Sequence, residues 1–320
     1  MLSTDCKTVK IPLSTPDFNL MFLSMESRTE TKSALKAVSE TFHHNVSGET
    51  LSQVIRNSSI SVKELGERAA EHFFSNLAHC NLSEIETAFC QRAQTVFCIS
   101  AVRNSTSFFA PFWACQAVVQ DLAQKVESVV IDMHQGNIVT TDGDIGERDA
   151  FGIPLTAKYL TVKGYAKDEV PNRYFLCTEG MSRFGLPELN LPEVPSNLLN
   201  DGAYLLRAVA QFLWTKLKNI HPEQPHLEIE NEAEMSSVFC EYGNPAFHAD
   251  QQISIPFALS LFDSAHESVI VVKNPDNYDD YYDWFLSVNE SILELRLAIQ
   301  RQQAENEITP HNPSPVTIAA

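Results

Sequence analysis

The segment 174–191 constrains the fold more strongly than any other part of the chain. It begins with an apolar run, continues into a loop that contains two glycines, and ends in a second apolar run after Pro187. Glycine permits positive φ and close backbone approach, and proline fixes φ ahead of the second run. The pattern therefore predicts a strand, a tight loop and a second strand. A stiff loop of this kind presents three charged side chains: Glu179, Arg183 and Glu188.

The surrounding sequence predicts a sheet with helices packed against it. Apolar β-branched runs at 95–102 and 128–132 flank a helical pattern at 109–126, which indicates a strand–helix–strand crossover with covered strands. Later strands, from 158–165 onward, follow one another along the chain with a single helix between them, which favours antiparallel pairing. We therefore predict an α+β fold, or an α/β fold, with a mixed, mostly antiparallel sheet covered by helices.

Local signals suggest where elements start and where the chain leaves the core. Two capping boxes, Ser61 to Glu64 and Ser83 to Glu86, predict helix starts. The acidic, proline-containing segment 219–235 is predicted to be a linker or an excursion. We predict three parts: an N-terminal extension packed on the core (1–60), a single α+β domain (61–303) and a disordered tail (304–320).

Charge and cysteine usage exclude several classes of protein. The net charge is −18, from 23 basic and 41 acidic side chains. Such a surface repels phosphate backbones and anionic lipid headgroups, so we expect neither a nucleic-acid partner nor a membrane partner. The seven cysteines are odd in number and scattered, no secretory signal precedes them, and no apolar run could span a bilayer. These features favour a cytoplasmic protein with reduced cysteines.

The charged side chains of the loop have two interpretations. Glu179, Arg183 and Glu188 could bind a polar ligand or act in acid–base chemistry. Alternatively, Glu188 accepts hydrogen bonds from backbone N–H groups and holds the loop, with Arg183 as its ion pair. The second interpretation is the simpler one, because the glycine and proline positions are explained by turn geometry alone.

Asp132 and His134 form a second candidate pair. They lie two positions apart at a predicted strand end and would point to one face, where they could bind a metal or orient a base. A pair that faces solvent is the alternative. The acidic loop around 142–149 lacks the spacing of a calcium-binding EF-hand, and no phosphate loop or dinucleotide fingerprint is present. We therefore predict no metal and no cofactor.

The loop also resembles a known family. Thr178-Glu-Gly-Met181, Phe184-Gly185 and Pro187-Glu188 are similar to the Thr-x-Gly-Met-x-x-Phe-Gly-x-Pro-Glu segment of domain of unknown function 4261, a group of bacterial domains. The similarity is specific over about a dozen residues and weak over roughly 95–275. It implies a bacterial, cytosolic protein from a family with no assigned activity, and it supplies no catalytic residue.

Two functional hypotheses follow. The first is a non-enzymatic binding or protein-interaction module that recognises an unknown protein or small-molecule partner, because no complete catalytic constellation is present. The second is a hydrolase-like enzyme with a site near the Gly180–Glu188 loop, formed by Glu188, Arg183, Asp132 and His134. The second hypothesis requires these side chains to meet at one concave pocket.

Overall fold

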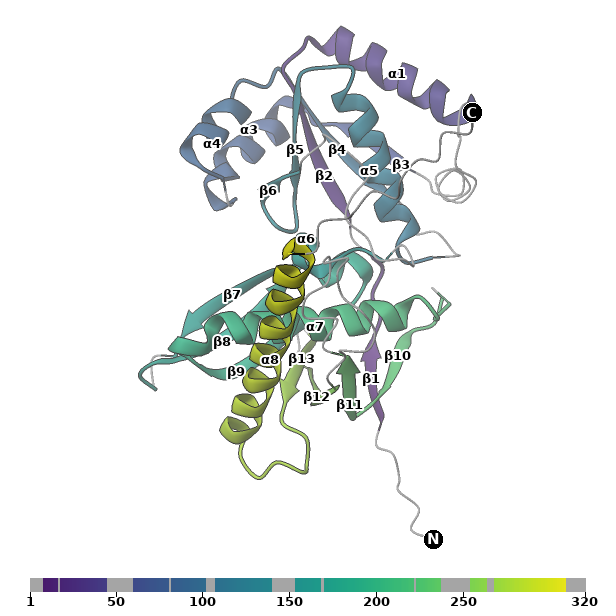
Figure 1. The fold of residues 1–320 in the computed structure, drawn as a ribbon. Coiled ribbons are helices and arrows are strands. Elements are labelled where there is room, and N and C mark those ends of the chain that lie inside the picture. The colour runs from purple at the N-terminus through teal and green to yellow at the C-terminus, as the bar shows by residue number, and fades with distance from the viewer. Residues whose placement is uncertain are drawn as a thin grey trace, which may run out of the picture.

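A computed structural model of the chain describes residues 8–16, 18–44, 60–80, 82–101, 107–139, 153–167, 170–221, 223–236, 254–263 and 268–308. These residues are organised around two sheets, one above the other in Figure 1. The helices and the mixed, largely antiparallel sheets confirm the predicted α+β class. Among the described helices, none is both long and apolar enough to cross a membrane.

The five-stranded sheet is antiparallel, in the order β3-β4-β2-β5-β6. Its strands are β2 (Asn19–Ser24), β3 (Ile60–Glu64), β4 (Thr95–Ala101), β5 (Ser128–Asp132) and β6 (Asn137–Ile138). Central β2 is apolar from Leu20 to Leu23, with Leu20, Phe22 and Leu23 fully buried, because helices cover both faces of the sheet.

Helices from different parts of the chain cover the two faces. α1 (Arg28–His44) and α5 (Ala110–Ala123) pack on one face, where Phe112 of α5 and Val38 of α1 join the larger core. α3 (Glu67–Asn76) and α4 (Glu84–Cys90) cover the other face, in a separate cluster that includes Phe73 and Cys90. Figure 1 shows these two pairs of helices on opposite sides of β2.

The six-stranded sheet has the order β11-β12-β13-β9-β8-β7. Its strands are β7 (Thr161–Ala166), β8 (Arg173–Glu179), β9 (Glu188–Pro195), β11 (Glu232–Ser236), β12 (Ser254–Asp263) and β13 (Ser268–Lys273). All neighbours are antiparallel except β13 and β9. A separate ribbon pairs β1 (Thr8–Pro12) with β10 (His226–Glu230).

Two long helices complete this part of the molecule. α7 (Leu199–Leu217) packs against β8 and β9 through a continuous apolar face that includes Leu205, Leu213 and Trp214. α8 (Tyr281–Ile308) crosses α7 in Figure 1 and buries Trp284, whose indole N–H donates to the Pro256 carbonyl at 2.8 Å. The short helix α6 (Thr156–Tyr159) leads into β7.

Several expectations about elements need correction. Ser61 to Glu64 is not a helix start but part of β3, because the segment pairs with β4 and tertiary pairing overrides a weak local signal. The second capping box is confirmed: the Ser83 hydroxyl accepts from Glu86 N–H, and the Glu86 carboxylate accepts from Ser83 N–H. Segment 219–235 is not a linker, since it supplies β10 and most of β11.

The N-terminal residues are also more than an extension. β1 belongs to the ribbon beside the six-stranded sheet, and β2 is the central strand of the other sheet. A domain boundary at residue 60 would therefore remove the central strand of the five-stranded sheet. Residues before 60 are part of the core and not an extension packed on it. The tail predicted to be disordered over 304–320 is helical in its first part, because α8 continues to Ile308, and the rest of it lies outside the described residues.

Candidate functional site

Glu188 holds the loop between β8 and β9 closed. One carboxylate oxygen accepts from the backbone N–H groups of Gly180, Met181 and Ser182 at 3.0, 3.0 and 3.3 Å. The other accepts from the Thr178 hydroxyl at 2.7 Å, and that hydroxyl in turn accepts from Leu189 N–H. Both oxygens are therefore engaged in holding the backbone, as the simpler interpretation of the sequence predicted.

Two glycines make this closed loop possible. Gly180 and Gly185 have φ values of 122° and 80°, in the region that side chains disfavour. Gly185 also lies against the backbone of Ser14, whose N–H donates to the Gly185 carbonyl at 2.9 Å. The loop is thus fixed to the connection between β1 and β2.

Arg183 does not pair with Glu188, which corrects our expectation. Its guanidinium instead forms an ion pair with Asp132 at the end of β5, with Nη2 and Oδ2 2.7 Å apart. The side chains are 0% and 2% exposed. This ion pair therefore connects the two sheets through the interior. Burial lowers the pKa of Arg183 below its ordinary value, and the Asp132 carboxylate opposes part of this shift.

Aromatic rings enclose the Arg183 guanidinium. The rings of Phe18, Phe112 and Tyr159 lie 5.6, 5.6 and 5.7 Å from its central carbon. Within the described residues, Nε and Nη1 have no hydrogen-bond partner, so the ring faces and Asp132 supply the negative potential that a buried cation requires. Arg183 is a buried connection between the sheets and has no access to a ligand.

The remaining predicted residues lie nearby in different roles. His134 donates its backbone N–H to Asp132 at 2.9 Å, and its ring stacks on Phe18 at 6.4 Å. Glu179 forms a partly exposed ion pair with Lys163 at 2.8 Å. The structure therefore brings Asp132, His134, Arg183 and Glu188 into one region, as the enzyme hypothesis required. However, both Glu188 oxygens hold backbone N–H groups and the Thr178 hydroxyl, and the Asp132 carboxylate contacts Arg183 and the His134 backbone N–H.

Metal ligands are not gathered in the part of the chain that the structure describes. No group of three His, Cys, Asp or Glu side chains in it could hold an ion. The acidic loop at 142–149 lies outside the described residues.

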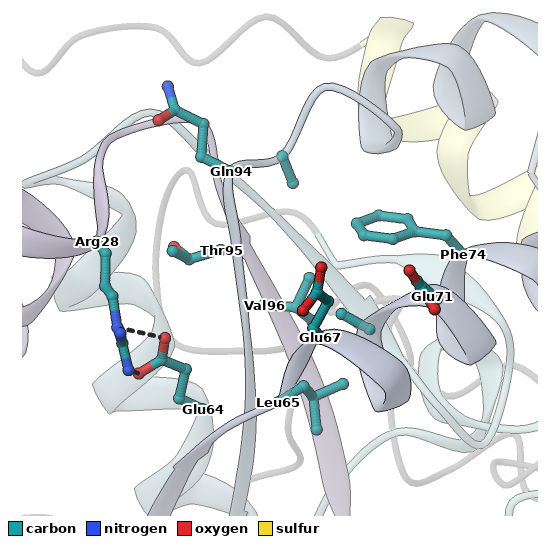
Figure 2. Close-up of a pocket in the computed structure, with 11 residues that line it drawn as sticks. Arg28, Glu64, Leu65, Glu67, Glu71, Phe74, Gln94, Thr95 and Val96 are labelled. Atoms are coloured by element: carbon teal, nitrogen blue, oxygen red, sulfur yellow. Dashed lines mark hydrogen bonds and ion pairs between the residues drawn. The ribbon is translucent and has the colours of Figure 1, made fainter.

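A groove of about 450 Å³ lies elsewhere, on the α3 side of the five-stranded sheet. Figure 2 shows its lining, which comes from α1, the end of β3, α3 and the start of β4. Apolar side chains form part of the groove, and carboxylates stand along it. The lining includes Arg28, Glu64, Leu65, Glu67, Ala70, Glu71, Phe74 and Val96.

The helical spacing of α3 explains one wall of this groove. Positions 67, 70, 71 and 74 fall on one face of a helix, three and four residues apart. Glu67 and Glu71 are exposed, while Phe74 is half-buried beside Phe73. Within the described residues, neither Glu67 nor Glu71 has an ion-pair partner at salt-bridge distance.

At the other end of the groove, the lining residue Glu64 already pairs with two cations of the same chain. Glu64 pairs with Arg28 at 2.7 and 3.0 Å and with Lys32 at 3.0 Å. The hydrogen bond from Lys32, together with Arg28, holds the pKa of Glu64 below its ordinary value, although desolvation opposes this shift. One end of the groove therefore has two cations on one carboxylate, whereas the carboxylates of Glu67 and Glu71 at the other end have no cation at salt-bridge distance among the described residues.

The sequence hypotheses missed this groove. A helix predicted to begin at Ser61 would place Glu64 within the helix, whereas in the structure it ends a strand. The spacing of Glu67, Glu71 and Phe74 was a detectable signal, because it places the three side chains on one helix face. That face forms the wall of a groove only because β4 lies beside α3. Comparison of the chain with protein-family models, curated proteins and solved structures gave no match.

Proposed function

We propose that this chain is a non-enzymatic protein-interaction module that receives a basic segment of a partner protein in the groove between α3 and β4. The observation that carries the proposal is the pair Glu67 and Glu71, which stand on one helix face beside an apolar lining without a cation of their own among the described residues. A partner side chain with an apolar stem and a positive head fits both parts of this surface.

The whole-chain charge supports the same partner chemistry. A net charge of −18 attracts cationic segments and repels nucleic acids and other acidic proteins. This long-range field attracts a basic segment towards the protein before contact and so raises the association rate. The volume of about 450 Å³ matches one or two side chains better than a folded domain, which favours a peptide-like segment as the occupant.

The enzyme alternative has weaker support. The loop at Gly180–Glu188 commits both Glu188 oxygens to the backbone amides and Thr178, and Arg183 is enclosed by aromatic rings and Asp132. A general base or an electrostatic stabiliser must instead reach a substrate atom. Five free cysteines in the described residues are compatible with the cytoplasmic location that the sequence predicted, and this location remains part of the proposal.

The test is binding of fluorescent basic peptides to the full chain, followed by anisotropy. The double variant Glu67→Gln, Glu71→Gln should weaken binding by about tenfold. An exposed ion pair contributes roughly 0.2–1 kcal/mol, and the variant removes two such interactions with the same ligand. Binding should also weaken as salt is added.

A matched control removes the same charge elsewhere. Glu290→Gln, Glu294→Gln changes two exposed carboxylates on α8 and alters the net charge by the same amount. Equal losses in the groove and control variants would mean that only the overall charge attracts the peptide. No binding of any basic peptide by the unmodified chain would reject the proposed function.

A further inference from the structure

We propose that the side chain anchored in the groove is an arginine, held between the carboxylates of Glu67 and Glu71 and the ring of Phe74. The inference rests on the proposed function and specifies its ligand. It predicts that the groove binds arginine more tightly than lysine, although both carry one positive charge. Attraction to an acidic surface alone would not distinguish them.

The first support is the geometry at the occupied end of the same groove. Arg28 contacts Glu64 through two nitrogens, with Nε 2.7 Å from Oε1 and Nη2 3.0 Å from Oε2. Two parallel contacts of this kind match the planar guanidinium and are not available to a single ammonium. The groove thus already binds a guanidinium with a carboxylate from its own wall, as Figure 2 shows.

The second support is the aromatic ring at the other end. Figure 2 shows the Phe74 ring and the Glu71 carboxylate at the same end of the groove. A ring face beside a carboxylate favours a flat, weakly hydrated cation, since guanidinium stacks on aromatic rings more readily than ammonium does. Leu65, Ala70 and Val96 provide apolar contact for the methylene stem.

The third support is that arginines of this chain lie over aromatic rings elsewhere in the structure. Arg92 lies over Phe89 at 5.1 Å and Arg173 over Tyr282 at 5.3 Å. Arg183 combines ring faces with a carboxylate, the combination offered by Phe74 with Glu67 and Glu71. The open end of the groove therefore has the composition of a guanidinium site without an arginine from the described part of the chain.

The experiment compares one peptide in three versions, with a central arginine, lysine or citrulline and neutral flanking residues. Citrulline has nearly the shape of arginine but no charge. We expect the arginine peptide to bind the full chain about tenfold more tightly than the lysine peptide, and the citrulline peptide to bind more weakly than either. Spermidine is included as a flexible polycation.

The variant Phe74→Leu separates ring stacking from charge. It should reduce the preference for arginine over lysine to about twofold while retaining lysine binding, since leucine keeps apolar volume but loses the ring face. The matched control Phe262→Leu alters an exposed phenylalanine on β12, 63% exposed, and should leave the preference unchanged. Thermal unfolding and circular dichroism confirm that each variant is folded before its binding is interpreted.

The outcomes distinguish the two proposals. Equal affinity for the arginine and lysine peptides would overturn the arginine inference and leave the interaction module standing. Absence of binding by both peptides would overturn the arginine inference, and absence of binding by every basic peptide would overturn the module as well. Spermidine binding as tight as that of the arginine peptide would show a site for any polycation, which also contradicts the arginine inference.

Discussion

Replacing Asp132 by asparagine tests whether the buried ion pair holds the two sheets together. The substitution keeps the size of the side chain and its backbone-accepting oxygen but leaves the Arg183 guanidinium without its counter-charge. At an effective dielectric constant near 20, charges about 4 Å apart interact by roughly 4 kcal/mol, which agrees with the usual loss on breaking a buried pair. We therefore expect Asp132→Asn to lower the free energy of unfolding by about 3–5 kcal/mol.

The assay is urea and thermal unfolding, combined with hydrogen exchange at the end of β5 and in the loop around Arg183. A loss of about 4 kcal/mol corresponds to a decrease in Tm of roughly 10 °C for a chain of this size. Exchange should increase at both places, because the ion pair connects the five-stranded sheet to the β8–β9 loop.

A double-mutant cycle separates the pair from its individual residues. Arg183→Met removes the buried charge but keeps an apolar side chain among the three rings, so the double variant Asp132→Asn, Arg183→Met should recover part of the stability. The control is Glu179→Gln, which breaks the partly exposed Lys163 ion pair and should cost less than about 1 kcal/mol. If Asp132→Asn costs no more than this control, the ion pair does not connect the sheets energetically.

Three further predictions concern the loop and the helix caps. Desolvation raises the pKa of Glu188 despite its hydrogen bonds, so the folded state binds its proton more readily than the unfolded state. The difference in free energy of unfolding between the unmodified chain and Glu188→Gln should therefore fall as pH rises through and above 4.5, the ordinary pKa of a glutamate. Urea unfolding at several pH values measures this difference, and an increase with pH would contradict the burial argument. Gly185→Ala should lower the free energy of unfolding by about 2–3 kcal/mol, because φ is positive and a Cβ would strike the Ser14 carbonyl. The control Gly66→Ala, with open space around the new Cβ, should cost less than about 1 kcal/mol in the same assay. Ser83→Ala should cost about 1 kcal/mol through loss of the capping box, and an unchanged Tm would show that α4 does not depend on it.

The sequence alone predicted the elements that depend on local pattern. The apolar runs of β4 and β5 are β-branched and short, and the structure contains strands at those positions. The role of Glu188 was also accessible, because a carboxylate after a glycine-bearing loop has nearby backbone amides to accept from. Ser61 to Glu64 shows the limit of this reasoning, since pairing with β4 outweighed a helix-capping pattern of equal local quality.

Tertiary structure decided which distant residues meet. Asp132 and Arg183 are 51 positions apart, and no sequence spacing indicates that the end of β5 faces the loop after β8. The sequence suggested Glu188 as the partner of Arg183 because it is closer along the chain, but packing of α5 against the loop turns Arg183 towards Asp132 between aromatic rings. The groove has the same origin: Glu67, Glu71 and Phe74 are set on one face by the helix period, and only their position beside β4 makes that face the wall of a groove.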